Sequence, residues 1–179
     1  GSTAFLSVNN LPIGVTAAFG TSSLAIPGST SLVFTSSSCA VPGIYTIQVV
    51  ATIGVLSSTT TYTLTVLPSV INITTSTQNL NLWNRAGNPA CAVDVTFNIS
   101  AGVTIGSSST SSPSLNTGPF ATGSNIIVNN SGVIAGKGGD GGDDSGHNLT
   151  SCPNKDGKVG GNAVELQCSG VVINNSGTI

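Results

Sequence analysis

The stretch that decides the fold is IIVNNSGVI at residues 126–134, because it returns as VVINNSGTI at residues 171–179. The two copies start 45 positions apart, and most of their differences exchange small or β-branched side chains. Each copy predicts a strand, an Asn-Asn-Ser-Gly turn and a returning strand, because Asn and Gly tolerate the left-handed backbone of turns. A repeat of this kind predicts units that stack, each burying one face on the next.

The composition predicts an all-β protein. Of 179 residues, 26 are Ser, 22 Thr, 23 Gly and 17 Asn, and only 6% are charged. With 39% apolar residues and a mean hydropathy of +0.33, the chain is apolar enough to fold. Strand formers dominate over helix formers, which excludes a helical bundle or a doubly wound α/β enzyme.

Charge and hydropathy also limit the partners. Four Lys and Arg residues and a net charge of −2 cannot neutralise a run of phosphates, so we expect no nucleic-acid binding. No apolar run approaches the ~20 residues of a membrane helix, so we expect no membrane insertion.

Composition divides the chain into three parts. Residues 1–67 are rich in Ser, Thr and Val, residues 70–125 continue that trend, and residues 126–179 are rich in Gly and Asn. The Ser-rich run 107–114 predicts a long loop, with an O-glycosylated patch as the alternative. The repeat stops at Ile179 before its Gly run, which favours a fragment of a longer protein.

The first part predicts half-buried strands. Residues 45–52 and 61–66 alternate apolar and polar side chains, and Gly54 with Ser57-Ser58 supplies a hairpin turn between them. The pieces LSVNNLPIGVTAAF, PGSTSLVFT, VPGIYTIQVVATIG and TTTYTLTVLP resemble bacterial immunoglobulin-like repeats. That resemblance implies a partial immunoglobulin-like sandwich over residues 1–67. Two strands that normally open such repeats are missing, either because the chain is a fragment or because a neighbouring chain donates a strand.

The rest of the chain predicts a further β module. Residues 93–100 alternate as a third clear strand, and INNSG-type repeats with a Gly-rich run follow. The pieces LNTG (115–118), IIVNNSGVI (126–134) and AGKGGDGG (135–142) resemble phage tail-tip and tail-fibre proteins. The resemblance implies a β-solenoid-like or polyglycine-type module, with glycines in extended helices of three residues per turn.

Nearly all charge lies in the last 43 positions, where the loop 137–158 is the candidate receptor-binding segment. Asp140, Asp143 and Asp144 are also weak calcium candidates, although a solvated acidic loop is the plainer interpretation and we expect no cofactor. The candidate receptor contacts are Lys137, Asp140, Asp143, Asp144, His147, Lys155 and Lys158.

Four cysteines predict disulfides of an exported or virion protein rather than a zinc site, because no C-x-x-C motif occurs. Cys152 with Cys168 would close the charged loop, leaving Cys39 with Cys91. The single histidine, His147, has no nucleophile elbow around it, so catalysis is not expected.

Two further patterns remain. Five N-x-S/T sequons occur, at Asn72, Asn98, Asn129, Asn148 and Asn174, and they matter only if the host glycosylates. Trp83 and Arg85 could contact sugar, although a Trp packed under the strands is the expected arrangement.

These features favour a structural and adhesive component of a phage tail tip or fibre. It would bind a host-surface glycan or protein, associate with copies of itself, and lie on the virion tail or another extracellular surface. The alternative is a subunit of an extracellular filament or surface adhesin assembled by strand donation. A polysaccharide-cleaving enzyme is the third hypothesis, and no catalytic pattern supports it.

Overall fold

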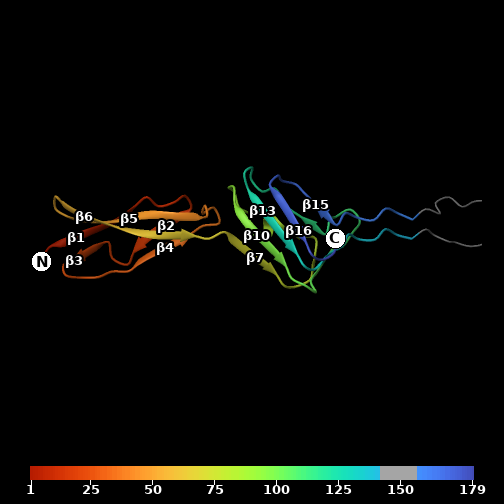
Figure 1. The fold of residues 1–179 in the computed structure, drawn as a ribbon, viewed down its shortest axis with the longest axis horizontal. Helices are drawn as coiled ribbons and strands as arrows, with labels where there is room; N and C mark the ends of the chain where they lie inside the picture. The colour runs from red at the N-terminus through yellow and green to blue at the C-terminus, as the bar shows by residue number, and fades with distance from the viewer. Residues whose placement is uncertain (142–156) are drawn as a thin grey trace, which may run out of the picture. The chain divides into compact units, whose positions relative to one another are not determined.

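A computed structural model describes residues 1–141 and 157–179 of the chain, which divides into two compact units, Gly1–Ser69 and Val70–Ile179. Strands dominate both units, as the composition predicts (Figure 1). The one helix among the described residues, α1 (Leu82–Arg85), is far too short to cross a membrane.

The first unit consists of antiparallel strands in two sheets. The four-stranded sheet has the order β3-β1-β5-β6, and the second sheet pairs β2 with β4. The long hairpin between β5 and β6 turns at Gly54, whose positive φ suits glycine, as the sequence predicts. The strands are β1 (Thr3–Asn9), β2 (Val15–Phe19), β3 (Ser23–Ala25), β4 (Leu32–Ser36), β5 (Gly43–Ile53) and β6 (Leu56–Val66).

The core of the first unit is small. Its buried apolar residues are Ala4, Val15 and Ile47. The rings of Phe34 on β4 and Tyr62 on β6 stack at 5.9 Å across the two sheets, yet Tyr62 remains 54% exposed. The second sheet has two strands and the first has four. The immunoglobulin-like resemblance and the origin of the missing strands stay predictions.

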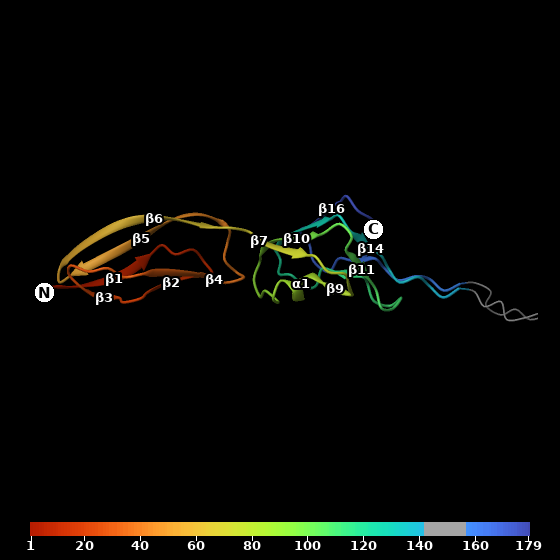
Figure 2. The ribbon, with the colours of Figure 1, turned by 90° about the horizontal axis from the view of Figure 1, so that it is seen from below.

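The second unit is a parallel β-solenoid of three sheets. Each coil of the chain passes through the three sheets in turn, so that equivalent strands stack in parallel (Figures 1 and 2). The first sheet contains β7 (Ser69–Ile73), β10 (Asp94–Ile99), β13 (Asn125–Asn130) and β16 (Val171–Asn175). The second contains β8 (Thr77–Gln78), β11 (Thr104–Gly106) and β14 (Val133–Ile134), and the third β9 (Leu80–Asn81), β12 (Leu115–Asn116) and β15 (Val164–Glu165).

The two copies of the sequence repeat pair with each other in successive coils of the solenoid. Ile126 pairs with Val171, and the pairing continues to Asn130 with Asn175. Between the two preceding coils the offset is shorter, because Asp94 pairs with Asn125 only 31 positions later. The period of 45 is therefore one coil lengthened by an insertion, and the Gly-rich run supplies it.

This stacking corrects the predicted boundary at residue 126. Residues 70–125 and 126–179 form one unit, because β13 lies between β10 and β16 in the same sheet. One continuous core joins the coils, with Phe97, Ile105, Leu115, Val128 and Ile134 fully buried inside it. The strands alternate buried and exposed residues, so each coil stabilises the next through apolar contact.

Candidate host-contact segment

An asparagine ladder runs along the outer face of the first sheet. The side-chain amide of Asn98 donates to Oδ1 of Asn72, Asn129 donates to Asn98, and Asn174 donates to Asn129, each at 2.9 Å. The asparagines of four of the five N-x-S/T sequons are therefore the members of this ladder, and the Ser or Thr of each sequon lies in the turn that follows. The fifth sequon asparagine, Asn148, lies outside the described residues. The recurring sequon pattern therefore reflects the stacking of these asparagines from coil to coil.

A buried asparagine fixes the corner after β13. Asn130 is 1% exposed, and its amide donates to Oδ1 of Asn175 and to the carbonyl of Thr178. Its Oδ1 accepts the backbone N–H of Gly132, so the polar side chain is satisfied inside the protein. The Asn-Asn-Ser-Gly turn thus places one Asn outward in the ladder and one inward at the corner.

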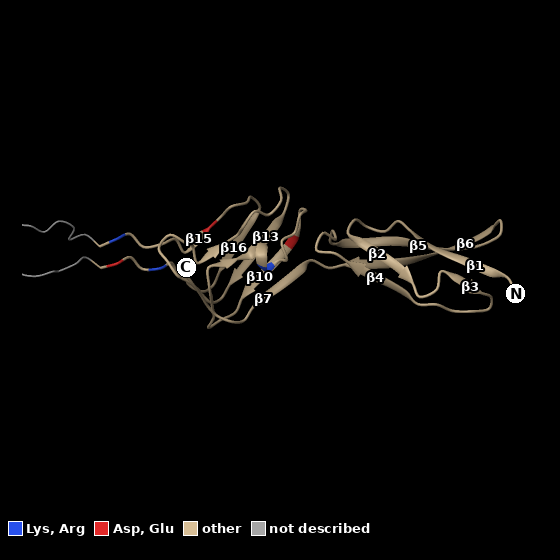
Figure 3. Cartoon of the chain, turned by 180° about the vertical axis from the view of Figure 1, so that it is seen from behind, with Lys and Arg blue, Asp and Glu red and all other residues tan. Residues whose placement is uncertain are grey.

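Two glycine-rich legs leave the solenoid between β14 and β15, and we name them by their residues, 135–141 and 157–163. They run antiparallel, because Lys158 N–H donates to the Asp140 carbonyl and Gly161 N–H to the Lys137 carbonyl (2.8 and 2.7 Å). Figure 3 shows them extending away from the solenoid with charged residues along them. Residues 142–156 connect their outer ends.

Close backbone packing explains the glycines of the legs. A Cβ on Gly139 would overlap the carbonyl of Lys158, and one on Gly136 would overlap that of Gly161. Gly138 and Gly141 face open space instead. The two crowded glycines are three positions apart, and the extended helix of three residues per turn that the resemblance implies stays a prediction.

The base of the legs is held by the solenoid and by the loop 107–114. Ala135 N–H donates to the carbonyl of Ile105, and the buried hydroxyl of Ser114 donates to the carbonyl of Ala135. The loop makes internal hydrogen bonds, because Ser107 Oγ lies 2.6 Å from the carbonyl oxygens of both Ser109 and Ser112, which share its single hydroxyl proton. The predicted long loop therefore supports the legs, a role that the sequence does not reveal.

The structure brings together three of the predicted contact residues. Lys137, Asp140 and Lys158 are exposed on the legs, and Lys158 Nζ lies 2.9 Å from Asp140 Oδ2. This hydrogen bond and the positive charge of Lys158 hold the pKa of the Asp140 carboxyl below its usual value, with a smaller contribution from the charge of Lys137. Asp143, Asp144, His147 and Lys155 lie outside the described residues.

No group of three His, Cys, Asp or Glu residues suited to a metal occurs within residues 1–141 and 157–179. Of the calcium candidates, Asp140 already binds Lys158, and the other two lie outside that range. Calcium at this loop remains untested.

The structure describes three of the four cysteines. Cys39 and Cys91 are each disulfide-bonded, and their pairing with one another stays a prediction. The side chain of Cys168 packs against the hydrophobic core. Cys152 lies outside the described residues, so its predicted disulfide with Cys168 stays a prediction.

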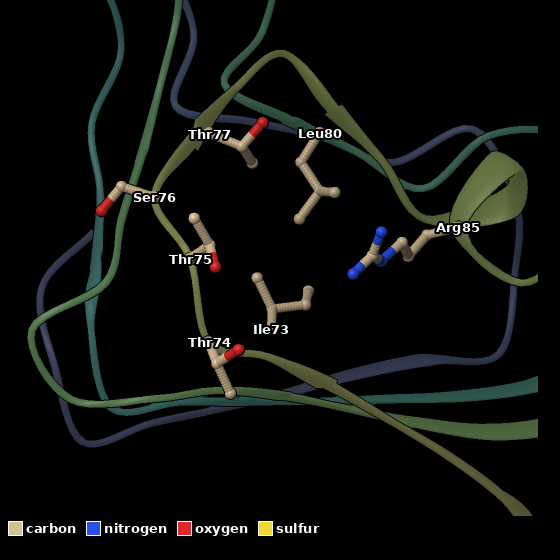
Figure 4. Close-up of a pocket in the computed structure, with 7 residues that line it drawn as sticks. All are labelled: Ile73, Thr74, Thr75, Ser76, Thr77, Leu80 and Arg85. Atoms are coloured by element: carbon tan, nitrogen blue, oxygen red, sulfur yellow. The ribbon is translucent and has the colours of Figure 1, made fainter.

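Trp83 packs against the core, and its indole N–H donates to the carbonyl of Pro89 at 3.1 Å. Trp83 is partly buried, and its packing against the core agrees with the expected arrangement. Arg85, its predicted companion, instead borders a separate cavity near β7 and β8 (Figure 4).

A comparison with family models completes the assignment. The model of the family described as Phage tail fibre adhesin Gp38 matches residues 68–179, more than half of the chain. The chain belongs to the Gp38 phage tail fibre adhesins. Neither curated proteins nor solved structures show a significant match.

The match begins at Pro68 and contains the whole second unit, including every strand of the solenoid and both glycine legs. The adhesin is therefore a component of the virion tail. This finding favours the first functional hypothesis over the filament subunit.

Proposed function

We propose that this adhesin contacts the host surface through the segment at the outer end of its two glycine-rich legs. The observation that carries the proposal is the backbone pairing of Asp140 with Lys158 and of Lys137 with Gly161. This pairing holds both ends of the 142–156 segment at one place, beyond the solenoid core. Such an arrangement lets the segment vary in sequence while the scaffold stays constant.

The chemistry of the segment suits polar recognition. Residues 1–136 carry two charged side chains, Arg85 and Asp94, whereas residues 137–158 carry both signs of charge in close sequence. Mixed charges within one short stretch of sequence steer encounter and give specificity through ion pairs and hydrogen bonds. The partner is therefore a host-surface glycan or protein with polar groups, and the role is binding without a catalytic step.

The test is adsorption with a segment whose four candidate contact residues are made neutral, while Asp156 keeps its charge. A variant carrying Asp143→Asn, Asp144→Asn, His147→Gln and Lys155→Gln keeps the length and the glycines. We expect purified variant protein to bind host cells at least about tenfold more weakly, because its charge-assisted contacts are lost. The matched control is Asp94→Asn, which removes an exposed charge from the solenoid. Equal binding of variant and parent would refute the proposal.

Association with further copies of the chain is a separate proposal. Sedimentation of the full chain over a range of concentrations measures its oligomeric state directly. A single monomeric species at every concentration would contradict self-association, and would leave the host-contact proposal intact.

A further inference from the structure

The strongest feature outside the legs is a cavity of about 230 Å³ at the first coil of the solenoid. It is lined by residues 73–77, which form the corner between β7 and β8, together with Leu80 and Arg85. Figure 4 shows the Arg85 guanidinium reaching in from α1 beside Ile73 and Leu80, with the side chains of Thr75 and Thr77 also at the opening. The cavity therefore joins an apolar floor to hydroxyl groups and one cation.

Arg85 has no counter-ion among the described residues. The one ion pair there joins Lys158 and Asp140, and the guanidinium of Arg85 makes no hydrogen bond to another described residue. The backbone that carries Arg85 is anchored, because Leu82 of α1 is fully buried and Asn81 caps the helix, whereas the Arg85 side chain itself is exposed. A guanidinium whose N–H donors are not used by the described residues is suited to bind a carboxylate in bidentate geometry.

A second groove of about 290 Å³ adjoins this cavity and shares Ser76 and Thr77 with it. Its other lining residues are Gln78, Thr104 and Gly106. Gly106 is the last residue of β11, and nothing crowds it, because an added Cβ would meet only Gln78 Cγ at 3.9 Å. An uncrowded glycine in a strand leaves room for a ligand to approach the backbone.

We propose that the cavity and the groove together bind an acidic oligosaccharide, with a sugar carboxylate on Arg85 and the neighbouring sugar over Gly106. Each volume is smaller than the roughly 300–1,000 Å³ of pockets for drug-sized ligands, so each accepts one sugar ring. The hydroxyls of Thr75, Thr77 and Thr104 and the amide of Gln78 offer both donors and acceptors to sugar hydroxyl groups. An acidic protein side chain would reach Arg85 but leave the groove empty.

This site goes beyond the host-contact segment, since none of its residues lies on the legs. It gives the adhesin a second contact, chemically specific for a uronic-acid type of sugar. Binding at the two places would combine as avidity where geometry allows both.

The test is NMR titration of the full chain with digalacturonic acid and with neutral digalactose as the matched ligand. We expect the acidic disaccharide to shift the backbone amides of Thr77 and Gly106, and Arg85→Gln to weaken its binding at least about tenfold. Gly106→Val should weaken binding of the acidic disaccharide and leave binding of monomeric galacturonic acid unchanged, because the valine fills only the groove. Thr96→Val, on another sheet, is the control variant.

Three results would overturn the proposal. The first is equal binding of the neutral and acidic disaccharides. The second is an absence of shifts at Thr77 and Gly106 at millimolar ligand. The third is that an acidic peptide binds in a manner that depends on Arg85, while neither sugar binds. The last result would assign Arg85 to a protein partner. None of them bears on the loop 142–156, so the two proposals fail separately.

Discussion

Asn174 donates its side-chain amide to Oδ1 of Asn129, its partner one full coil earlier, at 2.9 Å. Asn129 in turn donates to Asn98, so an interior member of the ladder takes part in two side-chain hydrogen bonds. The ladder ties coils of unequal length to one register. Its members differ in how much each one stabilises the solenoid.

Asn129→Ala should destabilise the second unit by about 1–2 kcal/mol, because it removes two hydrogen bonds. Asn72→Ala, at the end of the ladder, removes one bond and should cost about half as much. Urea unfolding followed by the fluorescence of Trp83 measures this, because the only Trp of the chain lies in the second unit. Equal effects of the two substitutions would contradict the ladder.

The core gives a larger expected effect. Phe97 is 0% exposed at the centre of the second unit, so Phe97→Ala should cost about 3–5 kcal/mol. Val172 lies half-exposed on β16, and Val172→Ala should cost less than about 1 kcal/mol. The same Trp83 signal compares both variants, and a small effect of Phe97→Ala would show that this part of the core is not the stabilising one.

The glycine legs predict a position-specific effect of added methyl groups. Gly139→Ala should force the legs apart, because its Cβ would overlap the Lys158 carbonyl, whereas Gly138→Ala meets nothing. Hydrogen exchange of the Lys158 and Gly161 amides should accelerate at least about tenfold in the first variant and stay unchanged in the second. The Trp83 unfolding transition should stay constant in both.

The Asp140–Lys158 pair predicts a pH dependence. A carboxyl whose pKa is lowered in the folded state stabilises the paired legs above its unfolded pKa, near 3.8, and loses that effect as pH falls through the lower folded value. Lys158→Gln should therefore raise the NMR titration midpoint of Asp140. High salt should reduce the difference between parent and variant, because the pair is largely exposed. An unchanged midpoint would exclude Lys158 as the cause.

Much of the fold could be predicted from local patterns. The alternation at residues 45–51, 62–66 and 93–99 predicts strands that the structure contains, and the turn at Gly54 lies where the sequence places it. The repeat at 126–134 and 171–179 predicts stacking, which the pairing of Ile126 with Val171 confirms. These features are local, because strand period and turn chemistry depend on near neighbours.

The site could be predicted only in outline. The charges at Lys137, Asp140 and Lys158 mark the segment that we propose as the host contact, yet no local pattern shows which glycines face a backbone carbonyl. The contact between the loop 107–114 and the base of the legs, and the cavity beside Arg85, each bring together residues that are distant in sequence. Both therefore depend on how the coils stack.

The sequence by itself therefore determined the β class, the stacked repeat and the segment that carries the charge, because composition, periodicity and turn residues act over a few positions. Tertiary structure alone decided that residues 70–179 form one unit, that sequon asparagines become a ladder, and that Cys168 packs against the core. The physical reason is that register between coils is a property of long-range packing. A coil can absorb an insertion such as the Gly-rich legs without changing which side chains meet in the core.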